Sequence, residues 1–155
     1  MIEELSGLVN WFISYLINLH TQNKHDVFCF VCKTKKKFYF IDTGVLNLFL
    51  VNQDSKLLEN AVYLALKRYG ASDIYYYKRK YETDFYIPET GQLIQVSYSI
   101  KDYQTREREL NSLKTAMKDL KINEGLIIRY DEEEAITDHE STISVVPFWK
   151  WVLEL

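Results

Sequence analysis

Residues 81–98 form one segment of strand-like and turn-like sequence, which reads YETDFYIPETGQLIQVSY. Residues 83–87 and 92–98 within it are rich in β-branched and aromatic side chains, which are enriched in strands. Pro88 and Gly91 lie between these segments and supply turn chemistry, because proline presets φ and glycine accepts a positive φ. The stretch therefore predicts a β-hairpin around which the rest of the chain is arranged.

The alternation of side chains gives this hairpin a row of polar groups. Successive residues of a strand point to opposite faces, so Asp84 shares a face with Glu82, and Gln95 shares one with Ser97. The flanking positions are mostly apolar. Because a polar row on an otherwise apolar sheet is costly unless it is satisfied or used, Asp84, Gln95 and Ser97 are candidate site residues.

Length and composition limit the classes of protein to consider. The 155 residues, 47% hydrophobic and 26% charged, are typical of a soluble globular protein with one ordinary core. The formal net charge of -3 gives no global signal for nucleic acid, so such a contact requires a local basic patch. No apolar run approaches the roughly 20 residues of a membrane span, and the amino end lacks signal-peptide character. We therefore expect a cytoplasmic protein with no membrane partner.

Residues 1–50 predict a helix followed by a basic hairpin. Apolar residues recur at steps of three and four over residues 5–19, and residues 27–31 and 38–41 have the composition of strands. This order is compatible with part of a winged helix, whose wing would contact phosphates; the alternative is a solvated turn. The candidate nucleic-acid-binding residues are Lys33, Lys35, Lys36 and Lys37.

Residues 51–155 predict a second unit of alternating helices and strands. A helix is expected from Asp54 or Ser55, both common N-caps, to about residue 69, with Gly70 as its stop. Glu59 lies among apolar residues at the edge of the buried face of this helix. The further elements expected are a strand at 73–78, the hairpin, a helix from about 105, a strand at 126–130, an acidic loop at 131–134, a strand at 143–146 and a helix that starts at Pro147.

The order of these elements predicts an α/β fold. A helix, a three-strand meander, a second helix and a fourth strand are followed by an added strand and a carboxy-terminal helix. The helix between the third and fourth strands is a crossover, which places the fourth strand parallel to one of the first three.

Six motifs in this order resemble a known family. They are FYFIDTG at 38–44, LLEN at 57–60, TDF at 83–85, IQVSY at 94–98, TRERE at 105–109 and VPFWKW at 146–151. Together with the order of elements they resemble the PD-(D/E)XK nuclease superfamily, and within it the carboxy-terminal domain of an archaeal and bacterial AAA+ ATPase family. The resemblance implies a restriction-endonuclease-like core and, elsewhere in such a protein, a P-loop module and a winged helix.

The resemblance also implies a site. Asp84 and Gln95 stand at the strand positions that hold Mg²⁺, Glu59 at the helix acid that completes the metal shell, and Ser97 at the position of the catalytic lysine. Mg²⁺ prefers anionic oxygens, and Gln95 offers a neutral one. Serine supplies no positive charge for the transition state. The candidate cations that could replace this lysine from a neighbouring element are Lys78, Lys101, Arg106 and Lys114.

These observations give three functional hypotheses. The first is a nuclease-like domain with weak or no hydrolysis that engages DNA or a protein partner for an AAA+ ATPase. The second is an active Mg²⁺-dependent DNA endonuclease that uses Glu59, Asp84 and Gln95, and the third is a protein-interaction module. A second copy of the chain is a further candidate partner. The sequence contains no GxxxxGK followed by Ser or Thr, so we expect no ATP site in this chain.

Overall fold

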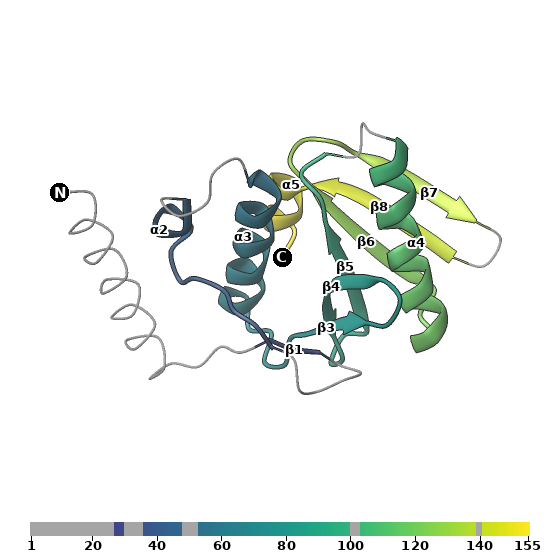
Figure 1. Cartoon of the computed structure of the whole chain (residues 1–155), viewed down its shortest axis with the longest axis horizontal. Helices are drawn as coiled ribbons and strands as arrows, with labels where there is room; N and C mark the ends of the chain where they lie inside the picture. Colours follow the sequence, from purple (N-terminus) through teal and green to yellow (C-terminus); the bar gives the residue numbers. More distant parts are fainter. Residues whose placement is uncertain (1–26, 30–35, 48–52, 100–102, 139–140) are drawn as a thin grey trace, which may run out of the picture.

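The computed structural model describes residues 27–29, 36–47, 53–99, 103–138 and 141–155 (Figure 1). The predicted helix at residues 5–19 lies outside these ranges, so the winged-helix resemblance and the division at residue 50 stay predictions. The elements are β1 (Val27–Cys29), β2 (Lys36–Lys37), α2 (Thr43–Asn47), α3 (Asp54–Arg68), β3 (Tyr75–Lys78), β4 (Glu82–Ile87), β5 (Gln92–Val96), α4 (Tyr103–Leu120), β6 (Glu124–Arg129), β7 (Glu134–Asp138), β8 (Ser141–Pro147) and α5 (Phe148–Leu153).

The strands form one eight-stranded mixed sheet in the order β2-β1-β3-β4-β5-β6-β8-β7. Strands β3, β4 and β5 are an antiparallel meander, and β5, β6 and β8 run parallel to one another. Helix α4 connects β5 to β6 as the crossover. The predicted α/β class, meander and parallel fourth strand are therefore confirmed.

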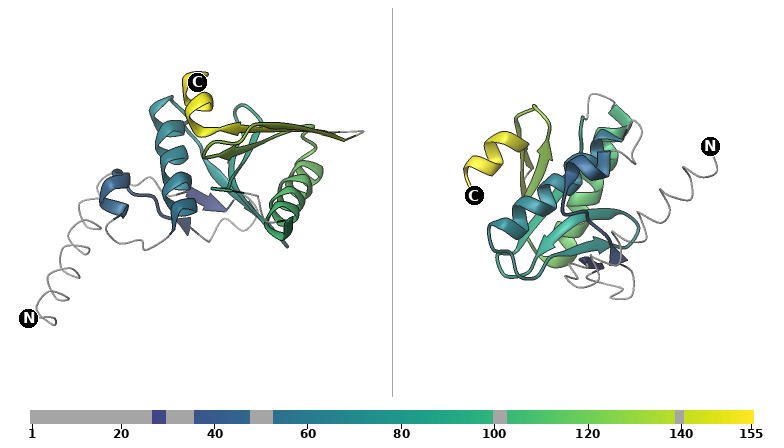
Figure 2. Two further views of the ribbon diagram at one scale, coloured as in Figure 1. Left: turned by 90° about the horizontal axis from the view of Figure 1, so that it is seen from above. Right: turned by 90° about the vertical axis from the view of Figure 1, so that its left-hand side faces the viewer.

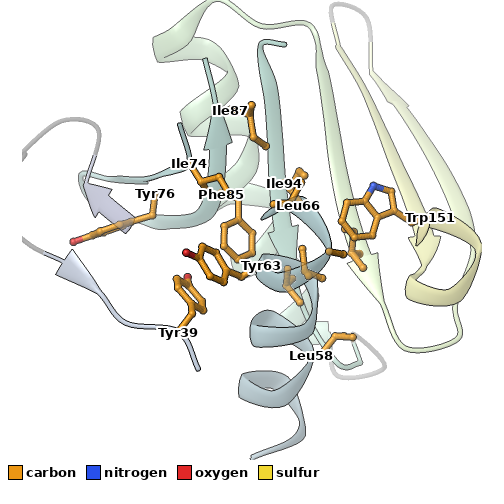
Figure 3. Packing of buried hydrophobic residues seen from close by; sticks show 14 residues of the cluster. Tyr39, Leu58, Tyr63, Leu66, Ile74, Tyr76, Phe85, Ile87, Ile94 and Trp151 are labelled. Atoms are coloured by element: carbon orange, nitrogen blue, oxygen red, sulfur yellow. The ribbon is translucent and has the colours of Figure 1, made fainter. Parts of the chain in front are cut away.

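The sheet is covered by helices on both faces (Figures 1 and 2). Helices α3 and α5 lie on one side and α4 on the other. Phe85 and Ile94 of the hairpin belong to the core cluster beside α3, whereas Leu93 packs with the cluster beside α4. Figure 3 shows the first cluster, in which Tyr39 and Tyr63 lie close to Phe85. The alternation of faces expected for these positions is confirmed.

Helix α3 ends as the sequence predicts. Gly70 has φ +94°, which only glycine adopts readily, and the Ala71 amide donates to the Leu66 carbonyl at 3.0 Å. The Gly70 amide donates to Lys67, which completes a Schellman motif. The other end differs: Gln53 is the N-cap, and Asp54 lies in the first turn, where its charge favours the helix dipole.

The region before α2 differs from the expectation. Strands β1 and β2 pair antiparallel, and β1 also pairs in parallel with β3, so this hairpin extends the main sheet. Phe40, predicted to lie in a strand, is not part of one. Its amide donates to Oδ1 of Asn60 at 2.8 Å and its carbonyl accepts from Nδ2 at 3.0 Å, so a buried side chain of α3 replaces a partner strand.

Strand β7 was not expected, because the sequence predicts an acidic loop at residues 131–134 and no strand before residue 143. It pairs antiparallel along its whole length with β8 and forms one edge of the sheet. Ile136 packs against the core cluster beside α4. The backbone partner supplied by β8 thus outweighs the low strand propensity of the local sequence.

Candidate functional site

The centre of the candidate site is the ammonium group of Lys37, which three carboxylates surround. Lys37 Nζ lies 2.8 Å from Glu82 Oε1 and 3.0 Å from both Glu59 Oε1 and Asp84 Oδ1. Its side chain is 17% exposed. An ammonium group has three N–H donors, so each of the three acids takes one. We call Lys37, Glu59, Glu82 and Asp84 the lysine cluster.

Helix α3 and the segment after β2 position the first acid. Tyr39 donates its hydroxyl to Glu59 Oε1 at 2.9 Å, and Lys56, one turn before Glu59, contacts Oε2 at 3.0 Å. The Tyr39 ring stacks on Tyr63 of the same helix, with 4.2 Å between centroids. Both carboxylate oxygens of Glu59 are therefore held, although the side chain is largely buried.

The second part of the cluster lies where β4 and β5 separate. Their ladder pairs Phe85 with Ile94 and continues toward the turn. Beyond that pair, away from the turn, side chains take the place of backbone partners between the two strands. The Asp84 amide donates to Gln95 Oε1 at 3.3 Å, and the Val96 amide donates to Asp84 Oδ2 at 3.0 Å. The polar row thus satisfies the backbone of two strands that diverge.

Gln95 connects the sheet to α4. Its Nε2 donates to Glu109 Oε2 at 2.6 Å, and Arg108 contacts Glu109 Oε1 through two nitrogens. Glu109 is 7% exposed, so this contact is buried. A continuous set of polar contacts therefore runs from Glu59 on α3, through Asp84 and Gln95, to α4.

The charges of the site cancel. Glu59, Glu82 and Asp84 carry three negative charges, and Lys37, Lys56 and Lys78 carry three positive charges, with Lys78 Nζ 2.6 Å from Glu82 Oε2. A buried charge is stable only when it is paired. The cluster meets this condition with groups of the chain itself.

The surroundings shift the pKa values of the buried groups. Burial raises the pKa of Asp84 to about 6, although Lys37 opposes this shift. Burial acts in the same direction on Glu59, but Lys37 and Lys56 hold the pKa of Glu59 below its ordinary value. Burial would lower the pKa of Lys37, but Asp84 and Glu59 raise it above its ordinary value. Lys37 is therefore a permanently charged group at neutral pH.

The structure brings together three of the four predicted catalytic residues. Glu59 and Asp84 share the Lys37 ammonium group, and Gln95 contacts the Asp84 backbone. Ser97 is buried separately, and its hydroxyl donates to the Ser99 carbonyl at 3.2 Å. Within the described residues, the side-chain contacts of Ser97 do not include Glu59, Asp84 or Gln95.

The basic residues differ from expectation in one case. Lys33 and Lys35 lie outside the described ranges, and Lys36 lies in β2. Lys37, predicted to bind nucleic acid on a hairpin tip, has its ammonium group among the carboxylates instead. Of the proposed replacement cations, Lys78 contacts Glu82, and Arg106 pairs with Glu134 at 2.7 Å. Lys101 is outside the described ranges.

Sequence reasoning missed the role of Lys37 and its neighbour Tyr39. One signal was available: the two residues are two positions apart in an extended segment, so both can face the same helix. The partner of that segment, however, is set by the pairing of β1 with β3, which joins residues far apart in the chain. The local pattern alone therefore favoured a surface turn.

The Mg²⁺ that the family resemblance implies does not fit the lysine cluster as it stands. The three acids converge on the point that Lys37 Nζ occupies, at 2.8 to 3.0 Å. Mg²⁺ requires oxygens at roughly 2.0–2.1 Å in octahedral order. Within the described ranges, no group of three or more His, Cys, Asp or Glu residues is arranged to hold a metal ion. An ion and the ammonium group cannot share this point.

A shallow pocket of about 430 Å³ lies at the start of α3, beside the cluster. It is lined by Gln53, Asp54, Ser55, Lys56 and Tyr98. Lys56 contacts Glu59 from this side. Tyr98 stacks on Tyr130, with 5.1 Å between ring centroids, and the Tyr130 side chain is exposed. The pocket thus combines a cation, Lys56, and an acid, Asp54, with one ring of an aromatic pair.

No helix among the residues that the structure describes has the length and apolar character needed to cross a membrane. The chain is 44% identical over 141 residues to a protein of Methanocaldococcus jannaschii named uncharacterized protein MJ1544. The match covers 80% of this chain and 32% of that protein, so the chain spans about a third of its relative's length. No family model matches the chain, and no solved structure matches it significantly. The chain is therefore similar to part of a longer archaeal protein whose name assigns no activity.

Proposed function

We propose that this chain is a nuclease-like domain of restriction-endonuclease-like fold that binds DNA with weak or no hydrolysis, in association with an AAA+ ATPase. The observation that carries the proposal is the lysine cluster. Glu59 and Asp84, the two acids that the family resemblance implies as metal ligands, are both paired with the ammonium group of Lys37, which also contacts Glu82. The resemblance of six motifs supplies the fold and the association. The greater length of the archaeal relative is compatible with a domain of a larger protein.

The chemistry of the site favours binding over hydrolysis. Metal-dependent phosphodiester hydrolysis needs anionic ligands free to hold the ion and a cation beside the attacked phosphate. Gln95 is neutral and is engaged by Glu109, and Ser97 is bonded elsewhere. The remaining acids are paired with lysines.

The rim of the site carries two exposed lysines, the type of residue that contacts DNA phosphates. The Lys56 and Lys78 side chains are 59% and 45% exposed. Each contacts one carboxylate, which leaves further N–H donors for a phosphate. Tyr98 lines the same pocket as Lys56 and stacks on the exposed Tyr130, so this aromatic pair provides a surface on which a base can stack.

The second candidate is an active Mg²⁺-dependent endonuclease, which Lys37 favours in one respect. It brings to Glu59 and Asp84 the cation that Ser97 cannot supply. Hydrolysis would require Lys37 to leave the centre of the acids so that a metal could enter.

The third candidate, an interaction module, is favoured by Trp149 and Leu153 on α5, which are 59% and 79% exposed.

DNA binding and cleavage assays test these alternatives together. We expect labelled single- or double-stranded DNA to bind with an affinity that falls as salt rises. Lys56→Gln and Lys78→Gln should each lower the slope of log affinity against log salt by about one, whereas Lys118→Gln on α4 should not. Supercoiled DNA with Mg²⁺ or Mn²⁺ should be nicked no faster by the wild type than by Asp84→Asn.

Two results would overturn the proposal. Metal-dependent nicking that Asp84→Asn abolishes would establish the endonuclease. Absence of DNA binding at low salt would favour the interaction module, for which Trp149→Ala and Leu153→Ala are the first variants to examine.

A further inference from the structure

We propose that Lys37 is the resident cation of the lysine cluster in place of a divalent metal. In the wild-type chain the cluster takes no metal ion, and an ion enters only where this ammonium group is removed. The inference goes beyond the proposed function because it rests on the contacts of Lys37 and not on DNA binding.

The geometry around Lys37 is that of a cation site. Three oxygens from three side chains approach one point to within 2.8 to 3.0 Å. They come from two elements, α3 and β4, which the core holds in place. The ammonium group has three N–H donors for the three carboxylate oxygens, so the hydrogen bonds of this site are complete without a further ion. Lys37 also lies over the Tyr76 ring, 5.2 Å from its centroid, which holds the ammonium group from another side.

Loss of Lys37 would affect the three acids unequally. Glu59 keeps Lys56, and Glu82 keeps Lys78. Asp84 keeps the amide of Val96 as a donor, but Lys37 is the cation with which it pairs. Asp84 is also buried. Removal of Lys37 therefore leaves three acids with two lysines, a net charge of -1, and a divalent ion would supply the missing positive charge beside Asp84.

The distances predict which ion would enter. Ca²⁺ binds oxygens at about 2.3–2.6 Å in flexible geometry, so each acid would need to move inward by only about half an ångström. Mg²⁺ would need a larger movement and strict octahedral order, and it loses its water reluctantly. We therefore expect Ca²⁺ and lanthanide ions of similar size to bind before Mg²⁺. Tyr39, whose hydroxyl is 2.9 Å from Glu59, is placed to sensitise a bound lanthanide.

Calorimetric titration and terbium luminescence of four proteins test the inference. They are the wild type, Lys37→Met, Lys37→Met with Asp84→Asn, and the control Lys80→Met, whose lysine lies over the Tyr81 ring. We expect Lys37→Met to bind Ca²⁺ at least about tenfold more tightly than the wild type and more tightly than it binds Mg²⁺. Tyrosine-excited Tb³⁺ luminescence should appear in Lys37→Met and be lost when Asp84→Asn is added. The control should behave as the wild type.

Thermal unfolding is the second readout. Ca²⁺ should raise the melting temperature of Lys37→Met but not that of the wild type, because an ion that binds only the folded state stabilises it. The inference is overturned if the wild type binds Ca²⁺ or Mg²⁺ as tightly as Lys37→Met. It is also overturned if Lys37→Met binds no better than Lys80→Met.

A measurement on the wild type keeps the inference testable should Lys37→Met fail to fold. The side-chain ¹⁵N resonance of Lys37, recognised by its proximity to the Tyr76 ring, should keep its position in millimolar Ca²⁺ or Mg²⁺. A shift of this resonance, or its loss, would mean that metal displaces the lysine, and would overturn the inference. None of these outcomes depends on DNA, so a failure of the proposed function is seen separately.

Discussion

At the scale of single residues, the contacts of Gln95 show why a neutral amide suits this position of β5. Both the oxygen and the nitrogen of its side-chain amide are hydrogen-bonded: Oε1 accepts from the Asp84 backbone amide, and Nε2 donates to Glu109. A carboxylate accepts but does not donate, so it cannot serve both partners. Gln95 and Glu109 are therefore a matched pair.

Gln95→Glu should destabilise the protein by about 2–4 kcal/mol, because it sets a second carboxylate against the buried Glu109. Glu109→Gln added to it should recover most of the loss by restoring one donor and one acceptor. Urea denaturation of the two single variants and the double variant measures the coupling as a double-mutant cycle. Additive effects would show that the two side chains are not matched in this way.

The residue scale also shows what sequence reasoning can and cannot find. Glu59, Asp84 and Gln95 were identified because local periodicity places them on defined faces of a helix and two strands. Lys37 was given a different role, because its contacts depend on a parallel pairing between β1 and β3. Ser97 follows the alternation of β5 in sequence but lies just beyond the end of that strand and bonds locally to Ser99.

At the scale of elements, two helices end in the same way with different residues. Helix α3 ends at Gly70, whereas after α4 it is Lys121 that has a positive φ, of 57°. The Ile122 amide donates to the Met117 carbonyl at 2.9 Å, as in the Schellman motif after α3. A side chain with a Cβ pays a steric cost in this conformation that glycine avoids.

Lys121→Gly should therefore stabilise the protein by about 0.5–1 kcal/mol. Lys118→Gly is the matched control: it makes the same exchange one turn earlier, inside α4, and should destabilise by about 1 kcal/mol. Both values follow from urea denaturation midpoints at equal slope. A loss of stability in Lys121→Gly would contradict the strain argument.

The packing of α4 on β6 depends on the absence of a side chain at Gly125. A Cβ there would lie 2.7 Å from Met117 Sδ and 2.9 Å from Leu113 Cδ2. Gly125→Ala should therefore cost about 1–3 kcal/mol of unfolding free energy. In a Met117→Ala background the added cost should be smaller, because one of the two clashes is gone. Equal costs in both backgrounds would place the strain elsewhere.

The elements that the sequence predicted well are those with strong local patterns. The hairpin, α3 and α4 combine periodicity with turn residues, and each formed close to its expected range. Strand β7 was missed and the segment at Phe40 was wrongly predicted as a strand, because their backbone partners, β8 and Asn60, lie outside the local sequence pattern. Local composition carries no information about such partners.

At the scale of the whole molecule, the interior strands of the sheet are covered on both faces, whereas each edge strand has only one neighbouring strand. Strands β5 and β6 lie in the interior of the sheet, with the α3 cluster on one face and the α4 cluster on the other. Strands β2 and β7 are the edges, and β2 is two residues long. Stability within the sheet should therefore decrease from the centre outward.

Hydrogen exchange measures this gradient directly. Backbone amides of β5 and β6 should exchange slowest, near the rate set by global unfolding, and those of β7 fastest among the strands from β3 onward. The comparison of β6 with β7 is internal, since both are read from one sample. Equal protection in these two strands would mean that the sheet opens as a single unit.

The position of Lys37 on an edge strand has a consequence for synthesis of the chain. A ribosome releases the amino end first, so β1 and β2 emerge before β3, their neighbour in the sheet, has been made. The ammonium group must then remain hydrated until Glu59, Glu82 and Asp84 have left the exit tunnel. Strands β1 and β2 are thus translated before β3 but complete their contacts only after β4 has been made.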